Sequence, residues 1–166
     1  ALPRAVQNGK DRKARMVMAN GSLLAGAAFS NSMVGLVHAI GHALGGVCHV
    51  AHGEAMTILL PAVMQYNLEK CKERYGELLL PLAGPEVYAA TPAELRAQKT
   101  IDTLVALRQQ LADLTGLPTT LSQTGRVKPE QFDEVASTAL NDGAIIVNPA
   151  EANHEEIVGI LREVWA

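Results

Sequence analysis

The sequence predicts an all-α protein, a helical bundle of about seven helices in one domain. Apolar residues recur at helical spacing along the 166-residue chain, most regularly between residues 91 and 115. Residues that typically start or end helices flank these segments. The only run typical of a β-strand, Ile145–Val147, is too short to seed a sheet. A chain of this length can bury well over half of its unfolded surface around one core.

The first two predicted helices lie in a stretch without formal charge. Residues 16–53 contain no Asp, Glu, Lys or Arg. A helix over 11–29 begins with an Asp N-cap, and a polar turn leads into a second helix over 33–44, which Gly45 and Gly46 would end. Polar residues interrupt the stretch, so it contains no apolar span of about twenty residues suited to a membrane. We therefore expect a buried pair of helices and no membrane partner.

Three further helices are predicted in the middle of the chain. A third helix over 54–75 would bend or restart at Pro61. A short fourth helix is expected over 77–82. The fifth starts at a capping box over 91–94, with Pro at the first helical position, and runs to Gly116.

Two helices are predicted at the end of the chain. One opens with a proline and covers 129–141. After an Asn-Pro turn at 148–149, the last helix covers 153–165, and Asn153 with Glu156 can form its capping box.

Charge and cysteine content exclude some classes of partner and compartment. A formal net charge of −3 gives no support for nucleic-acid binding. The two cysteines, Cys48 and Cys71, lack a C-x-x-C spacing and suit a reducing cytosol. The first residues do not have the pattern of a secretory signal. We expect a cytoplasmic protein.

Four of the five histidines lie within fifteen residues: His38, His42, His49 and His52. On a helix, His38 and His42 share one face with Cβ atoms about 5–6 Å apart, a spacing that can hold zinc, iron, copper or nickel. Ala39 stands where a zinc protease would carry its catalytic Glu, so a protease is disfavoured. One histidine in an apolar segment is more often a hydrogen-bonded core residue, but four together favour a metal site. The spacing does not name the ligands.

A metal site built from this segment alone would be incomplete. Zinc and iron sites take several protein ligands, often including a carboxylate. No acidic residue occurs over 17–53, and a role at a helix start accounts for Glu54 equally well.

Other polar residues have simpler explanations. We interpret Cys48 as a buried structural thiol and His154 as a surface residue. Turn chemistry accounts for Asp142, Gly143 and Asn148, although these residues could also shape a loop near a site.

Residues 35–67 read GLVHAIGHALGGVCHVAHGEAMTILLPAVMQYN. This segment resembles the C-terminal signature of the iron-containing (group III) alcohol dehydrogenases: Gly-x-x-His, a second His four residues on, Gly-Gly, His-Gly, Leu-Pro and Asn. Residues 14–32 resemble the helix that precedes this signature, and residues 148–165 resemble the end of the family. The resemblance covers essentially the whole chain.

The resemblance implies a two-domain enzyme of dehydroquinate-synthase-like architecture. Its N-terminal α/β domain would bind NAD or NADP, and its C-terminal helical domain would hold a divalent metal. Residues 1–166 would be most of the helical domain, truncated at its N-terminal side, with the nucleotide-binding domain outside this chain. His38 and His52 would bind iron (alternatively zinc) together with an Asp and a His upstream of Ala1. His42 would be catalytic and would contact the nicotinamide cofactor.

The implied activity is the NAD(P)-dependent interconversion of alcohols with aldehydes or ketones by hydride transfer. The metal would act as a Lewis acid on the alcohol oxygen, and His42 would orient groups or relay the proton. We expect a homo-oligomer, and we expect residues 1–166 alone to be inactive. Two departures are Ala51, where the family usually has Pro, and the missing basic residue after Asn148-Pro149. The implied role of His49 stays open.

Two alternatives remain at this point. One is a zinc polyol dehydrogenase or a dehydroquinate-synthase-like enzyme of the same superfamily, although the Gly-Gly and His-Gly-Glu context fits the iron alcohol dehydrogenases better. The other is a non-catalytic helical module for binding or assembly.

Overall fold

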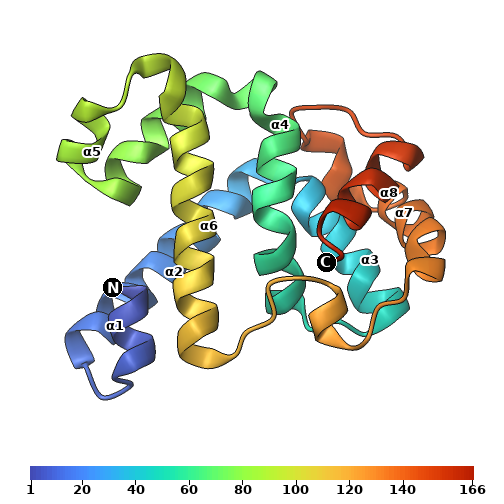
Figure 1. Ribbon diagram of the computed structural model, residues 1–166, viewed down its shortest axis with the longest axis horizontal. Helices are drawn as coiled ribbons and strands as arrows, with labels where there is room; N and C mark the ends of the chain where they lie inside the picture. The colour runs from blue at the N-terminus through green and yellow to red at the C-terminus, as the bar shows by residue number, and fades with distance from the viewer.

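The computed structural model describes residues 1–166 and is all-α, with eight α-helices, four short 3₁₀ turns and no strand (Figure 1). The α-helices are α1 (Leu2–Gln7), α2 (Arg12–Ser32), α3 (Leu36–Cys48), α4 (His52–Ala83), α5 (Pro85–Ala90), α6 (Arg96–Thr115), α7 (Phe132–Leu140) and α8 (His154–Glu163). The 3₁₀ turns are η1 (Ala93–Leu95), η2 (Ser122–Thr124), η3 (Pro129–Gln131) and η4 (Gly143–Val147). The all-α prediction is confirmed.

Helix α4 lies between α3 on one side and α6 on the other (Figure 1). The main core of 24 buried residues comes mostly from α3, the first half of α4, α7 and α8. On the other side of α4, the fully buried hydroxyl of Thr100 in α6 donates to the carbonyl of Tyr75 at 2.7 Å. Residues 38–52, which carry four of the histidines, therefore span the junction of α3 and α4 beside the main core.

The chain after residue 115 largely follows the prediction. Gly116 ends α6 in the left-handed conformation, with φ of 72°. Asn153 and Glu156 form the predicted capping box: Glu156 N donates to Asn153 Oδ1 at 3.0 Å, and Asn153 N donates to Glu156 Oε2 at 2.8 Å. Ile145–Val147 lies in the 3₁₀ turn η4 and not in a strand.

The end of α3 was predicted incorrectly. Gly45 and Gly46 do not stop the helix, which continues to Cys48. The residue that ends it is His49, which adopts the left-handed conformation with φ of 56° and ψ of 31°. The N–H of His49 donates to the Gly45 carbonyl at 3.1 Å, and the N–H of Val50 donates to the Leu44 carbonyl at 3.3 Å. Packing of α3 in the core outweighs the weak helix propensity of the two glycines.

The predicted third and fourth helices are one helix of 32 residues, α4, with Pro61 and Pro81 inside it. Proline removes a backbone donor from a helix interior, a cost that tertiary packing must offset. Pro61 is buried, and the Arg108 guanidinium of α6 donates to the carbonyl of Ile58, one turn before it, at 3.3 Å. The short helices α1 and α5 were not predicted.

The predicted capping box at residue 91 does not form. The Thr91 hydroxyl donates to the Val87 carbonyl at 2.7 Å, so it caps the end of α5 rather than the start of the next helix. The 3₁₀ turn η1 then leads into α6 without a side-chain cap.

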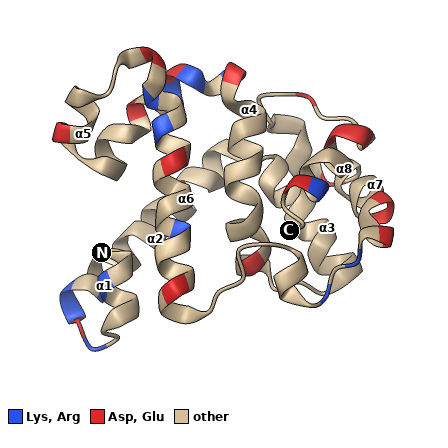
Figure 2. Ribbon diagram, in the orientation of Figure 1, with Lys and Arg blue, Asp and Glu red and all other residues tan.

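The expected buried pair of helices is also wrong, because α2 buries only Ala14. Large apolar side chains of α2 are exposed, with Leu23 at 73%, Leu24 at 70% and Phe29 at 53%. In the ribbon of Figure 2, no residue of α2 beyond its first turn is coloured as Lys, Arg, Asp or Glu. The predicted polar turn after residue 29 is helical, and the side chains of Ser30 and Asn31 donate to carbonyls four residues back within α2.

No single helix is long and apolar enough to cross a membrane. Helices α2 and α3 meet that criterion only when taken together, and they are bent by 101° relative to each other.

The helical position of Gly46 generates a prediction. A Cβ at this residue would meet nothing within 4 Å. Gly46→Ala should therefore raise the free energy of unfolding by about 0.5–1 kcal/mol, because alanine loses less backbone entropy in a helix. The same substitution at Gly116, where φ is 72°, should instead destabilise the protein. Urea unfolding of both variants measures this, and a loss of stability in Gly46→Ala would contradict the helix end observed here.

Candidate functional site

Three histidines from two helices form a triangle at the junction of α3 and α4. His38 and His42 lie one turn apart on α3, and His52 is the first residue of α4. The ring centroids are 5.7 Å apart for His38 and His42, 5.5 Å for His38 and His52, and 5.7 Å for His42 and His52. The structure thus brings together all three histidines that the sequence assigned to the site.

The turn between α3 and α4 explains why His49 is not part of the triangle. The left-handed backbone of His49 reverses the chain, and buried Val50 anchors the turn in the core. The carbonyl of His49 accepts a hydrogen bond from Arg126 Nη1 at 3.1 Å, and the same nitrogen lies 3.8 Å from Glu54 Oε2. His49 therefore has a structural role: it ends α3 and directs His52 toward His38.

The triangle lies at the surface and not in a buried pocket. His38 is half-buried, whereas His42 and His52 are exposed, with 44% of the His42 side chain accessible. Burial lowers the pKa of His38, and the neighbouring His42 and His52 lower that pKa further, which outweighs the opposing charge of Asp142. A neutral imidazole is the form that binds a metal ion.

Asp142 is the only carboxylate that hydrogen-bonds to the triangle. Its Oδ2 lies 2.8 Å from His42 Nδ1, and its Oδ1 accepts the N–H of Ala144 at 2.7 Å. Burial raises the pKa of Asp142, but the hydrogen bonds from Ala144 and His42 and the charges of His42 and His38 outweigh this, so its pKa lies below the ordinary value. Asp142 is therefore an ionised acceptor at neutral pH.

A network between buried Asn67 and half-buried Asn148 fixes the start of α3. Asn148 and Asn67 exchange two hydrogen bonds, of 2.8 Å and 3.0 Å between their side chains. Asn148 Oδ1 also accepts the N–H of Leu36 at 3.1 Å, and its Nδ2 donates to the Ala150 carbonyl at 2.7 Å. A Cβ on Gly35 would lie 2.9 Å from Asn148 Oδ1, so the close approach requires glycine. Asn148 thereby joins α3, α4 and the segment before α8.

Two residues of the triangle could hold part of a metal's ligand set. His38 and His52 converge from two helices, while His42 already has a hydrogen-bond partner. No three His, Cys, Asp or Glu side chains of the chain are arranged to hold a metal ion together. Because zinc and iron sites use at least three protein ligands, two imidazoles fit as a portion of a ligand set rather than a complete one.

Other sequence candidates lie outside the triangle. Cys48 and Cys71 are buried free thiols, and burial raises the pKa of Cys48. His154 lies on α8, where its Nε2 is 3.1 Å from the Asp133 carbonyl oxygen. Cys48 is buried as expected, and His154 lies at the surface as expected, with 39% of its side chain exposed.

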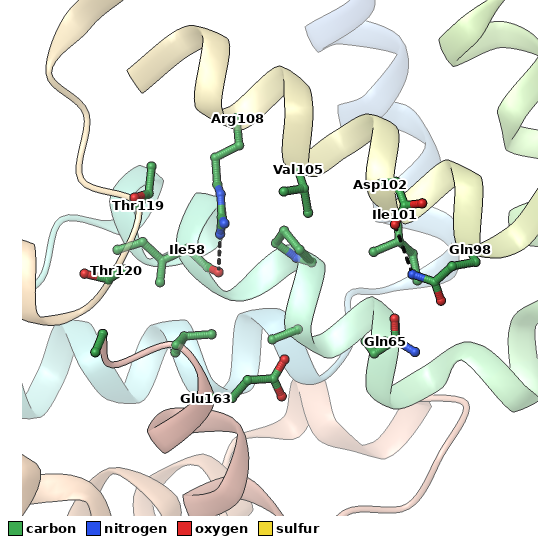
Figure 3. Close-up of a pocket in the computed structure, with 14 residues that line it drawn as sticks. Ile58, Gln65, Gln98, Ile101, Asp102, Val105, Arg108, Thr119, Thr120 and Glu163 are labelled. Carbon is green, nitrogen blue, oxygen red and sulfur yellow. Dashed lines mark hydrogen bonds between the residues drawn. The ribbon is translucent and has the colours of Figure 1, made fainter. Parts of the chain in front are cut away.

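A hollow of about 300 Å³ lies apart from the triangle, between α4 and α6 (Figure 3). Arg108 points from α6 to the Ile58 carbonyl, and its buried Nε has no hydrogen-bond partner. Thr119 and Thr120 stand near Arg108, whereas Glu163 and the hydrogen-bonded pair of Gln98 and Asp102 lie elsewhere along the walls. Its polar groups are spread out and do not converge on one point, in contrast to the histidine triangle.

Asp142 is the site residue that the sequence did not assign. An Asp-Gly pair signals a turn, and Asp142 does use Oδ1 for that turn. Asp142 Oδ2 contacts His42, which is 100 residues away in the sequence, so no local sequence pattern predicts this contact.

Known proteins resemble this chain over its whole length. The family described as "Fe-containing alcohol dehydrogenase family, C-terminal" matches residues 1–165. Alcohol dehydrogenase 4 of Saccharomyces cerevisiae is 34% identical over 99% of this chain, and the NAD-dependent methanol dehydrogenase of Bacillus methanolicus is 35% identical over 97%. The crystal structure of a 1,3-propanediol oxidoreductase superposes with a TM-score of 0.90 at 35% identity over 99% of the chain. The chain spans only 40% of the two curated relatives and 41% of that structure.

The amide network generates a stability prediction. Asn67 is 5% exposed, and Asn67→Ala removes both of its hydrogen bonds with the half-buried side chain of Asn148. We expect a loss of about 1–3 kcal/mol in the free energy of unfolding. Gln65→Ala, an exposed amide on the same helix, is the control and should change stability by less than about 0.5 kcal/mol. Chemical denaturation measures the free energy of unfolding of both variants, and equal losses in the two would contradict a stabilising role of the network.

Proposed function

Because the chain belongs to the iron-containing alcohol dehydrogenase family, we propose that it is the helical, metal-binding part of an NAD(P)-dependent alcohol dehydrogenase. Such an enzyme interconverts alcohols with aldehydes or ketones by hydride transfer. The observation that carries the proposal is the triangle of His38, His42 and His52, with ring centroids 5.5–5.7 Å apart.

His38 and His52 are the proposed metal ligands. They come from different helices, and neither ring nitrogen of either residue hydrogen-bonds to another group of the chain, so each can turn a lone pair toward a shared ion. Iron, or zinc as the alternative, would supply Lewis-acid chemistry at this place. We propose that the remaining ligands, an Asp and a His, come from a helix upstream of residue 1 in a longer protein, as the family resemblance implies.

His42 is the proposed catalytic and cofactor-contacting residue. Its Nδ1 is bound to Asp142, whereas its Nε2 makes no hydrogen bond within the chain. An exposed imidazole with one free ring nitrogen can orient a substrate oxygen or hold a proton at Nε2 during alcohol oxidation.

The rest of the enzyme would include a nucleotide-binding domain upstream. Relatives that match this chain are about 2.5 times as long, since the match covers 40% of their length. The name of the Bacillus methanolicus relative supports NAD as the cofactor. The uncovered apolar face of α2 also supports a further body that packs on this chain. Cytoplasmic location and homo-oligomeric state stay predictions from the sequence.

Two histidine variants test the division of roles in the complete gene product, purified without oxygen. His52→Ala should lose both bound metal and dehydrogenase activity, because a ligand is removed. His42→Ala should keep its metal while kcat falls by about 10²–10⁴-fold, the usual contribution of a positioned acid or base. Elemental analysis and NAD(P)H absorbance measure the two quantities.

His154→Ala serves as the control, because His154 lies on α8 outside the triangle and should leave both quantities unchanged. Equal metal loss in His42→Ala and His52→Ala would contradict the proposal that His52 binds the metal and His42 does not. A wild-type protein that holds no divalent metal and oxidises no alcohol would overturn the proposed function itself and favour a non-catalytic helical module.

A further inference from the structure

We propose that Asp142 is a positioning residue for His42: it fixes the orientation and tautomer of the imidazole so that the unprotonated Nε2 faces the reaction site. This inference rests on the proposed function for its catalytic meaning, but its structural part can be measured without it.

The contact joins two distant parts of the chain. His42 lies in the middle of α3, and Asp142 lies in the turn between α7 and η4, where α3 packs against α7 and η4. The distance from His42 Nδ1 to Asp142 Oδ2 is 2.8 Å, typical of a charge-assisted hydrogen bond. The orientation of the His42 ring is therefore set by a turn 100 residues later in the sequence.

The carboxylate is itself held in place. Oδ1 of Asp142 accepts the N–H of Ala144 at 2.7 Å, which caps η4. With Oδ1 fixed by the backbone, Oδ2 is aimed at α3. Asn148, only six residues beyond, anchors the same segment to the start of α3 through the N–H of Leu36 at 3.1 Å. Both ends of this loop thus contact the helix that carries His42.

The chemistry of the pair selects one tautomer. An ionised carboxylate only accepts hydrogen bonds, so the proton of a neutral His42 ring must lie on Nδ1. Nε2 then carries the lone pair. This is the arrangement by which carboxylates orient catalytic and metal-binding imidazoles in many enzymes, through the nitrogen opposite the reacting one.

Stability alone does not explain the pair. The two side chains are 44% and 25% exposed, and ion pairs with this much solvent contact contribute only about 0–1 kcal/mol. The turn would form with Oδ1 alone. The specific consequence of the second contact is control of the His42 ring.

The test replaces Asp142 by Asn, which keeps an oxygen for the Ala144 N–H but offers an N–H₂ group to His42. Nitrogen-15 NMR of the histidine-labelled 166-residue chain should show the Nδ1–H tautomer for His42 in the wild type and the Nε2–H tautomer in Asp142→Asn. In the complete enzyme, kcat should fall by about 10²–10⁴-fold while metal content and KM stay within about twofold.

Asp133→Asn is the matched control, because Asp133 is an exposed carboxylate of α7 whose Oδ1 lies 3.9 Å from His154 Nε2. It should change neither the His42 tautomer nor kcat. An Nε2–H tautomer in the wild-type chain, or an active enzyme whose kcat survives Asp142→Asn, would overturn the positioning role. A wild-type enzyme that is inactive but has the Nδ1–H tautomer of His42 would instead overturn the proposed function, while the contact between Asp142 and His42 would be confirmed.

Discussion

The hydrogen bonds of the Asn148 side chain are the constraint on which the site depends. This one amide caps the N-terminus of α3, pairs with Asn67 in α4 and closes its own loop on Ala150. It therefore fixes the two helices that carry His38, His42 and His52, and it also fixes the loop that carries Asp142. Each such bond adds only about 0.5–1.5 kcal/mol net, but a buried amide left unpaired costs about 1–3 kcal/mol, so the arrangement is strongly preferred over partial alternatives.

Within that frame, a tight connection places the third histidine. His49 adopts the left-handed backbone conformation, which is uncommon for non-glycine residues but is observed for His. The next residue, Val50, is buried. Only Val50 and Ala51 then separate His49 from the start of α4. The short reversal places the His52 ring 5.5 Å from that of His38, although thirteen residues separate them in sequence. Helical spacing alone would have paired His38 with His42 as the metal ligands.

The sequence predicted several features that depend on local chemistry, although the capping box expected at residue 91 does not form, and it missed those that depend on contacts between distant residues. The Asn153 and Glu156 capping box and the Gly116 helix end are local, and both form as predicted. The continuation of α3 through Gly45 and Gly46 and the passage of α4 through Pro61 go against propensity and are favoured by core packing. The Asp142 contact with His42 has no local signature, because the turn explains the residue by itself.

The central claim is that the triangle divides into two metal ligands, His38 and His52, and one imidazole, His42, that does not bind the metal and whose Nδ1 is held by Asp142. Proton NMR of the complete protein with cobalt(II) bound tests it most directly, because a coordinated imidazole gives a strongly shifted N–H resonance and a free one does not. We predict that His38→Gln and His52→Gln each lose shifted N–H signals, either one signal or all of them when the metal is released, while His42→Gln keeps them all. Loss of a shifted signal in His42→Gln, with the His38 or His52 variant retaining all of them, would contradict the claim.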